Sequence, residues 1–556
     1  MVQDYKGVVF SFQQKKTRRR RQRLRLALSA LLLLAACTGY RFLRVSAAVS
    51  KTQDLLLAGR VKEADKRIAA LSSSLFLRAD IRELRALSDL INDRLPQAQA
   101  QFDKLKTDGA APDLRSGQFQ KYFLDRGEYL KLKLYTEYRL ARGGDENIWF
   151  HALVQSAMLN DSESEKAIAR LSPGYRKNNA KALALLAKIN ADLRLGHCAY
   201  IFDKNGSPLA TLDVRRHKTR SLLPGLDFSD FDRQLKNGLS FFRLTLDARM
   251  QNEIHRLFTG YHGTLLLLEL PENGILAAYS KPRLPAAANA VFFETYEPGS
   301  SVKVVSLLAY LRQEDQSVFP FTCPGQVTIG KRIFYDSIAH KQVKDHVEAL
   351  DVSCNISFAE MGLKTGWPRL TSMLELFRFN AQPFRDGFLE FPTGRFSKEL
   401  DDDFRLANLA VGLNEITLTT CHGALLAAVF SQNGLLYPPY LIDDAKSILD
   451  LGYYGHKSQP LRLLGDDLNF RQVRKAIRQR LKRGSDNGSL ASEAELAVKT
   501  GIAGDPKQGL DAMAIGFFPF DQPRYAFAFR LEGAGKPELN EANFLRGLVE
   551  LLLQTK

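Results

Sequence analysis

Three short segments, far apart in the sequence, carry side chains suited to one kind of acyl transfer. In chain order they are Ser300-Ser301-Val302-Lys303, Ser353-Cys354-Asn355 and Lys499-Thr500-Gly501. A serine hydroxyl needs a base to attack an amide carbonyl, and a lysine shielded from water can become that base because its pKa falls. Ser300 and Lys303 lie one helical turn apart and share a face. The spacing therefore predicts Ser300 as nucleophile and Lys303 as its base.

The residues around these segments predict the elements that position them. Glu297-Pro298-Gly299 predicts a turn before a helix that opens at Ser300 and continues through an apolar run. Ala494–Val498 predicts a strand that leads into Lys499. A second Lys-Thr-Gly triplet, at 364–366, is followed by Trp367-Pro368, which predicts the end of a helix rather than a strand. We therefore assign the catalytic triplet to Lys499.

The chain has 556 residues and a formal net charge of +17, with 45% hydrophobic and 25% charged residues. This composition is that of folded protein, and the length predicts several domains. The first 25 residues carry nine Lys and Arg against one Asp and so supply +8 of the charge. We expect a basic cytoplasmic tail at 1–25 and no nucleic-acid binding, since no DNA- or RNA-binding motif follows the tail.

An apolar stretch at 26–45 follows the basic tail. One interpretation is an uncleaved membrane anchor, favoured by the long basic segment before it. The other is a cleaved lipoprotein signal, because Leu34-Ala35-Ala36-Cys37 resembles a cleavage box that would leave a lipidated Cys37. Both place the remainder outside the cytoplasm at the inner membrane.

Residues 46–195 are rich in Ala, Leu, Lys and Gln, with apolar residues at helical spacing. An internal period of 34 residues relates segments that start at Gly59, Asp93 and Gly127, with a weaker fourth copy from Asp161. The spacing resembles tetratricopeptide repeats and predicts helix pairs. Such an array is either a docking surface for a protein partner of the cell-wall machinery or a spacer.

The composition changes near residue 196. Asn205-Gly206 predicts a hairpin turn between two strands, so we expect a small β segment or linker at 196–240. From 241 to 556, amphipathic helices alternate with strand-like runs such as Gly263–Glu269. This length is ample for one α/β domain.

The three motifs, in their order, resemble the transpeptidase domain of class B penicillin-binding proteins, which share them with class A β-lactamases. The resemblance covers about 200–556 and extends to further segments: Asp203–Gly206, Leu244–Gln251, Tyr296–Ser300, Ala349–Asn355, Asn414–Thr419 and Ala512–Pro519. It implies a β-lactamase-like fold with a five-stranded antiparallel sheet sandwiched by helices. It also implies acyl transfer on peptidoglycan stem peptides that end in D-Ala-D-Ala, and covalent inhibition by β-lactams.

The resemblance also implies a role for each site residue. Ser300 would attack the penultimate D-Ala carbonyl while Lys303 takes its proton, and Ser353 would pass a proton to the leaving D-Ala. Asn355 would bind the substrate amide. Lys499 and Thr500 would bind the terminal carboxylate, and Gly501 would let the strand approach closely. The backbone N–H groups of Ser300 and Ile502 would form the oxyanion hole.

Two features depart from the family pattern. Ile502 stands where the family usually has Thr or Ser, whose hydroxyl helps to hold the carboxylate, so we expect weak β-lactam binding or an altered acyl donor. The N-terminal half shows neither a glycosyltransferase domain nor the usual class B pedestal. A D,D-carboxypeptidase and a non-catalytic scaffold or sensor therefore remain alternatives to a transpeptidase, whereas the anchor and the chain length disfavour a β-lactamase.

No cofactor or metal is predicted. The five cysteines are irregularly spaced and show no CxxC pattern, and the histidines form no HxxxH or HxxE pair. His340 and His346 are interpreted as loop or surface residues rather than catalysts.

Overall fold

A computed structural model describes residues 3–554, except 75, 108–115, 127, 142–144, 214–215, 217, 236–238, 284–288, 400–401, 448–451, 464–467, 482–493 and 508. The chain forms two compact units, Met1–Ala184 and Leu185–Lys556. The boundary between them lies inside the helix α10, Ala180–Arg194, whereas the sequence prediction placed it at the end of that helix.

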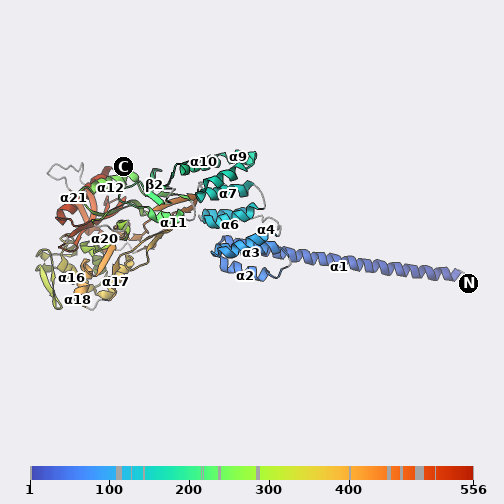
Figure 1. Ribbon diagram of the computed structural model, residues 1–556. Helices are drawn as coiled ribbons and strands as arrows, with labels where there is room; N and C mark the ends of the chain where they lie inside the picture. The colour runs from blue at the N-terminus through green and yellow to red at the C-terminus, as the bar shows by residue number, and fades with distance from the viewer. Residues whose placement is uncertain are drawn as a thin grey trace. The chain divides into compact units, whose positions relative to one another are not determined.

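The first unit is helical in every described element. Its first helix, α1 (Gln3–Leu57), is a single long rod that extends beyond the stacked helices (Figure 1). One stretch of α1, Arg20–Leu57, is long and apolar enough to cross a membrane by length and composition. The helices after it are α2 (Val61–Leu71), α3 (Arg78–Ile91), α4 (Leu95–Thr107), α5 (Ser116–Asp125), α6 (Tyr129–Leu140), α7 (Asp145–Ala157), α8 (Asp161–Ala169) and α9 (Pro173–Asn178).

The 34-residue period of the sequence matches helix starts in this unit. The helices α2, α4 and α6 begin at Val61, Leu95 and Tyr129, which are 34 residues apart. Gly59 and Asp93, each two residues before its helix, have positive φ angles of 72° and 61°. Gly127 lies outside the described residues.

The fourth copy has a different register from the predicted one. Helix α8 begins at Asp161, and Leu159, two residues earlier, has a positive φ of 63°. Asp161 therefore corresponds to Val61 rather than to Gly59, and Ser164 takes the buried position of Ala64 and Ala98. The 34-residue pattern did not predict this register because Leu159 occupies the turn position that Gly59 and Asp93 occupy in the earlier segments.

The second unit is built on a six-stranded antiparallel sheet with the order β20-β21-β22-β23-β5-β6. The sheet has six strands rather than the five that the family resemblance implied, because β20 pairs with the edge of β21. The strands are β5 (Gly263–Glu269), β6 (Gly274–Lys281), β20 (Arg478–Leu481), β21 (Ala494–Ala503), β22 (Asp511–Phe518) and β23 (Tyr525–Leu531). The predicted strands at 263–269 and 494–498 are confirmed.

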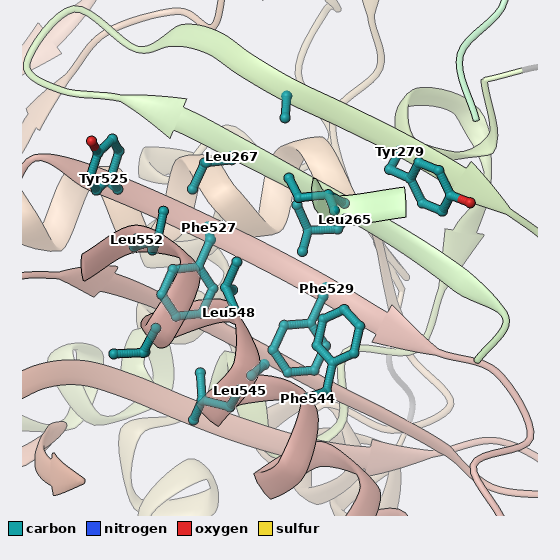
Figure 2. Close-up of a cluster of buried hydrophobic side chains, with 14 of the residues drawn as sticks. Leu265, Leu267, Tyr279, Tyr525, Phe527, Phe529, Phe544, Leu545, Leu548 and Leu552 are labelled. Carbon is teal, nitrogen blue, oxygen red and sulfur yellow. The ribbon is translucent and has the colours of Figure 1, made fainter. Parts of the chain in front are cut away.

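Helices cover both faces of this sheet, which explains why the strands read as continuous apolar runs rather than as alternating ones. On one face, α12 (Ala248–Leu257) and α21 (Pro537–Gln554) pack against Leu265, Leu267, Phe527 and Phe529 in a buried cluster (Figure 2). On the other face, α19 (Thr420–Ser431) is buried along its whole length, and its Thr420 hydroxyl lies 2.6 Å from that of Thr264 on β5.

A second six-stranded sheet has the order β18-β17-β4-β1-β2-β3. The predicted hairpin around Asn205-Gly206 is confirmed as β1 and β2. However, the segment at 196–240 is part of this larger sheet, because β4 pairs with β17 from 200 residues further along. The strands are β1 (His197–Phe202), β2 (Pro208–Asp213), β3 (Lys218–Ser221), β4 (Ser240–Leu244), β17 (Ile442–Ser447) and β18 (Gly452–Gly455).

The hairpin turn also anchors the main sheet's first helix. Asp203 Oδ1 accepts hydrogen bonds from the backbone N–H groups of Asn205 (2.9 Å) and Ser207 (2.7 Å), and its Oδ2 accepts one from Ala248 at the start of α12 (3.2 Å). Asp247 caps the same helix. Two of the segments that carried the family resemblance are thus joined in space.

The remaining elements of the second unit are 3₁₀ turns, short strands and helices, and some of them carry residues of the candidate site. They are η1 (Ser229–Phe231), α11 (Asp232–Leu235), α13 (Ala290–Phe293), β7 (Thr295–Tyr296), η2 (Gly299–Val302), α14 (Lys303–Leu311), β8 (Phe321–Cys323), β9 (Gln326–Ile329), β10 (Arg332–Tyr335), β11 (Lys341–Val343), α15 (His346–Asp351), α16 (Asn355–Thr365), α17 (Trp367–Leu376), β12 (Phe384–Asp386), β13 (Leu389–Phe391), β14 (Arg395–Phe396), α18 (Asp403–Val411), β15 (Ile416–Thr419), β16 (Leu435–Leu436), β19 (Arg462–Leu463) and α20 (Leu468–Ala476).

Candidate active site

Ser300 lies in a tight 3₁₀ turn, η2, that leads directly into the buried helix α14. The predicted turn followed by a helix is thereby confirmed. Three glycines bring this turn against its neighbours. A Cβ on Gly299 would lie 2.7 Å from the Ile502 carbonyl oxygen, one on Gly412 would lie 2.0 Å from the Gly299 oxygen, and one on Gly501 would lie 2.7 Å from the Pro298 oxygen. A side chain at Gly299 or Gly501 would push the nucleophile's turn away from β21, and one at Gly412 would push the turn away from the residue that ends the helix before it.

Lys303 is the first residue of α14 and its side chain is fully buried. Its Nζ donates to the Ser353 carbonyl oxygen and to Asn355 Oδ1, both at 2.7 Å, and lies 3.4 Å from Ser353 Oγ. The amine also lies 5.1 Å from the centre of the Phe358 ring. The first two motifs of the sequence therefore meet at one amine.

The third motif reaches the same serine from the sheet. Lys499, on β21, is 5% exposed, and its Nζ donates to Ser353 Oγ at 3.1 Å and to the Thr500 carbonyl oxygen at 3.1 Å. The Ser353 hydroxyl thus lies between two lysine amines. The backbone of Ser353 has a φ of +54°, an uncommon conformation for a residue with a side chain. In this conformation the Ser353 hydroxyl lies beside the amines of Lys303 and Lys499.

Burial lowers the pKa of both lysines. The pKa of Lys303 falls from 10.5 to about 7 because the amine is removed from water and faces the positive charge of Lys499, partly offset by Asp336. The pKa of Lys499 falls to about 8 through burial, against the attraction of Glu541 and Asp351. Near neutral pH the arrangement favours a neutral Lys303 beside a charged Lys499.

Thr500, Gly501 and Ile502 follow Lys499 along β21, in register with Ala514, Met513 and Ala512 of β22. Thr500 and Ile502 are partly exposed, whereas Gly501 is buried under the nucleophile's turn. The structure thus brings together Ser300, Lys303, Ser353, Asn355, Lys499 and the three residues after it. The other Lys-Thr-Gly triplet ends the helix α16, with Gly366 at its C-cap (φ 76°), as predicted.

Sequence reasoning missed two supports of the site. Gly412 follows the helix α18, and its carbonyl oxygen accepts a hydrogen bond from Gly299 N at 2.9 Å. Glu297 Oε1 accepts one from Asn414 N at 3.1 Å. The signal for Gly412 was a glycine at the end of an apolar helix, which ordinarily indicates only a helix cap.

A profile of the penicillin binding protein transpeptidase domain matches residues 263–546. Among curated proteins, stage V sporulation protein D of Bacillus subtilis is 25% identical over 332 residues, which cover 52% of this chain and 49% of that protein. The peptidoglycan D,D-transpeptidase PbpA of Mycolicibacterium smegmatis is 27% identical over 263 residues, covering 44% of this chain and 52% of the relative. This chain spans about half the length of the curated relatives it matches.

Among solved structures, penicillin-binding protein A of Mycobacterium tuberculosis matches with a TM-score of 0.54 and 19% identity, covering 64% of this chain and 99% of that one. That likeness shows the fold. The main sheet and its two helical layers therefore define a transpeptidase-type domain. The chain belongs to the penicillin-binding protein transpeptidase family.

Proposed function

We propose that this protein is a peptidoglycan D,D-transpeptidase that forms an acyl-enzyme on Ser300 and is inhibited covalently by β-lactams. The observation that carries the proposal is the meeting of three separate motifs at one hydroxyl, Ser353 Oγ, which lies 3.4 Å from Lys303 Nζ and 3.1 Å from Lys499 Nζ. Family membership and the curated relatives named D,D-transpeptidases support it.

In the acylation step, Ser300 Oγ attacks the carbonyl carbon of the penultimate D-Ala while its proton passes to Lys303. A neutral amine keeps two N–H groups, which match the two acceptors at 2.7 Å, and its lone pair is then free to take the proton. The lowered pKa of Lys303 supplies the neutral form near pH 7. The oxyanion that forms would accept hydrogen bonds from the backbone N–H groups of Ser300 and Ile502.

Collapse of the tetrahedral adduct breaks the peptide bond, and the leaving D-Ala amine needs a proton. Ser353 can relay it from Lys303, since its hydroxyl lies beside both amines. Asn355 would bind the substrate amide, while the charged Lys499 and Thr500 bind the terminal carboxylate. An acceptor amine from a second stem peptide then takes the acyl group and restores Ser300.

Replacement of the acceptor amine by water would give a D,D-carboxypeptidase, and failure to acylate would leave a scaffold or sensor. Ile502 is the residue that favours these alternatives, because it gives the substrate carboxylate no hydroxyl. Its backbone N–H is unaffected, so the expected consequence is weaker carboxylate binding rather than loss of acylation.

We infer that α1 anchors the protein in the inner membrane, with the helices after α1 and the second compact unit outside the cytoplasm. The apolar part of α1 and the basic residues before it support this orientation. We further propose that the helical unit is a tetratricopeptide-like array that binds a protein partner of the cell-wall machinery or acts as a spacer. The 34-residue spacing of three helix starts supports the repeat assignment.

The testing experiment is intact mass spectrometry of the protein with a thioester donor ending in D-Ala and, separately, with penicillin. We expect an adduct that maps to Ser300 and is absent from Ser300→Ala. Addition of a D-amino acid acceptor then separates transfer from hydrolysis by the product formed. The absence of an adduct from both wild type and Ile502→Thr would refute the enzymatic proposal and favour the scaffold.

A further inference from the structure

A cluster of four buried side chains lies next to the Ser353 loop and takes no part in the acyl-transfer scheme. Cys323, Asp336, His340 and Cys354 each offer one ligand atom, and these atoms all lie within 4.8 Å of one another. The two cysteines are 1% and 0% exposed, and the side chains of His340 and Asp336 are 8% and 1% exposed. Two thiols, an imidazole and a carboxylate are a common ligand set of tetrahedral zinc.

The hydrogen bonding of His340 is incomplete without a further ligand. Its Nδ1 is buried and lies 3.5 Å from Asp336 Oδ2, yet it makes no hydrogen bond with any described residue. A buried polar atom without a partner costs free energy, so its position calls for an explanation. An ion shared by His340 and Asp336 supplies that partner.

Backbone N–H groups hold two of the other ligand side chains in place, as hydrogen-bonding neighbours hold the ligands in metal sites. Asp336 Oδ1 accepts a hydrogen bond from Ser337 N at 2.8 Å, which leaves Oδ2 directed at Cys323 Sγ (3.7 Å). Cys354 Sγ accepts one from Ser357 N at 3.4 Å. These bonds fix a carboxylate and a sulfur on two sides of the same small space.

Ligand spacing is compatible with a metal ion after a small contraction. Zinc bonds of about 2.0–2.3 Å in a tetrahedron place ligand atoms roughly 3.3–3.8 Å apart. The four atoms are within 4.8 Å of each other, so side-chain movements of about 1 Å or less bring them to the separations of a zinc site. Two thiols disfavour magnesium and calcium, which prefer oxygen ligands alone.

We propose that Cys323, Asp336, His340 and Cys354 bind one zinc ion that fastens the Ser353 loop to the β8–β11 segment. Cys323 ends β8, Asp336 follows β10 and His340 precedes β11, while Cys354 caps α16 between Ser353 and Asn355. The strands β8 and β11 pair directly, with Lys341 opposite Cys323. The ion thus adds a link between the segment 321–343 and the residues around Ser353, beside the hydrogen bond from Ile356 N to Asp336 Oδ2 (3.4 Å). The linked residues lie next to Ser353 and Asn355, which both accept hydrogen bonds from Lys303.

This site was not predicted from the sequence, because Cys323, Asp336, His340 and Cys354 are separated by 13, 4 and 14 residues and form no short motif. His340 lies in a loop, as predicted, but its side chain is buried rather than at the surface. A disulfide between Cys323 and Cys354 is the competing outcome in an oxidising compartment, and it would leave His340 Nδ1 unexplained.

The test is the metal content of the full chain, purified in detergent without a metal-affinity step and dialysed against a weak chelator. We expect about one zinc ion per chain, measured by inductively coupled plasma mass spectrometry. Cys323→Ser and His340→Ala should lower it at least tenfold, whereas the matched controls Cys421→Ala (buried, on α19) and His197→Ala (exposed) keep it. Cobalt substitution should give a thiolate-to-metal absorption band that Cys323→Ser weakens.

Zinc content in wild type no higher than in His340→Ala would overturn the proposal, as would a disulfide-linked Cys323–Cys354 peptide in a non-reducing digest. If a variant misfolds, the wild-type protein still tests the zinc site. Removal of the metal with a strong chelator should lower the melting temperature of the wild type, and zinc but not magnesium should restore it. An unchanged melting temperature together with no bound metal would refute the site. Because none of these measurements uses a substrate, they stand apart from the outcome of the acylation experiment.

Discussion

The rate of acylation should follow a narrow bell-shaped pH profile set by Lys303 and Lys499. The lowering of the Lys303 pKa from 10.5 to about 7 corresponds to ~5 kcal/mol of preference for the neutral amine. Below about pH 7 the base is protonated, so the second-order rate constant of acylation should fall about tenfold per pH unit. Above about pH 8, Lys499 loses the charge that binds the carboxylate, and the rate should fall again.

The sharper test is the removal of one charge. After burial, the charge of Lys499 is the largest factor that lowers the Lys303 pKa. Lys499→Gln keeps a hydrogen-bond donor for Ser353 but removes the charge, so it should move the acidic limb of the profile to higher pH and abolish the basic limb. The absolute rate also falls, because the carboxylate loses its cation. Lys507→Gln, at an exposed loop position, is the control and should leave the profile unchanged.

The assay is stopped-flow acylation by a fluorescent penicillin between pH 5.5 and 9.5, with protein integrity checked by circular dichroism at each pH. A rate that stays flat across the range would contradict the role of Lys303 as base. An acidic limb that does not move in Lys499→Gln would contradict the electrostatic coupling of the two amines, since each pKa would then be set by burial alone.

Three other substitutions test separate parts of the structure. Gly501→Ala places a Cβ 2.7 Å from the Pro298 oxygen and should lower the acylation rate more than tenfold with little loss of folded protein, whereas Gly174→Ala, which meets nothing within 4 Å, should not. Ile502→Thr should tighten donor binding by ~1.5–3 kcal/mol, read as a lower KM for a thioester with a free carboxylate; no change would show that the carboxylate binds elsewhere. Burial raises the pKa of Glu541 to about 8, so the stability that its protonated carboxyl contributes is present at low pH and lost as pH rises through that value. Glu541→Gln should therefore raise the melting temperature relative to wild type at pH 9 but not at pH 4. An equal shift at both pH values would refute the raised pKa of Glu541.

The sequence predicted the parts of the fold that depend on local pattern. The strands at 263–269 and 494–498, the helix after Ser300 and the hairpin at Asn205-Gly206 each have a short-range signal, namely periodicity or turn chemistry. Pairings between distant segments have no such signal. The strand β20 at the sheet edge and the pairing of β4 with β17 depend on which surfaces meet in the folded chain, and both were missed.

The same division applies to the candidate site. Ser300, Lys303, Ser353, Asn355 and Lys499 were predicted because each stands in a short motif. The structure places Lys303, Ser353, Asn355 and Lys499 within hydrogen-bonding distance of one another and Ser300 in the turn before Lys303. The glycine contact at Gly412 and the cluster around His340 were not found. Their roles depend on contacts with residues distant in the sequence, such as Gly299 for Gly412 and the two cysteines for His340, and a lone glycine or histidine has many ordinary structural roles.

The unbroken helix α1 has a mechanical consequence. Leu55 and Leu56, at its end, are buried in the helical unit, and the helix continues without interruption from the apolar stretch to these residues. Because α1 is one continuous helix, a rotation of its apolar part about the helix axis also rotates the helices that pack against its end. Inserting one alanine between Tyr40 and Val49 would turn the helical unit by about 100° around the axis of α1 and advance it by about 1.5 Å. With α1 as the proposed membrane anchor, the number of residues in α1 therefore sets the direction in which the helical unit faces.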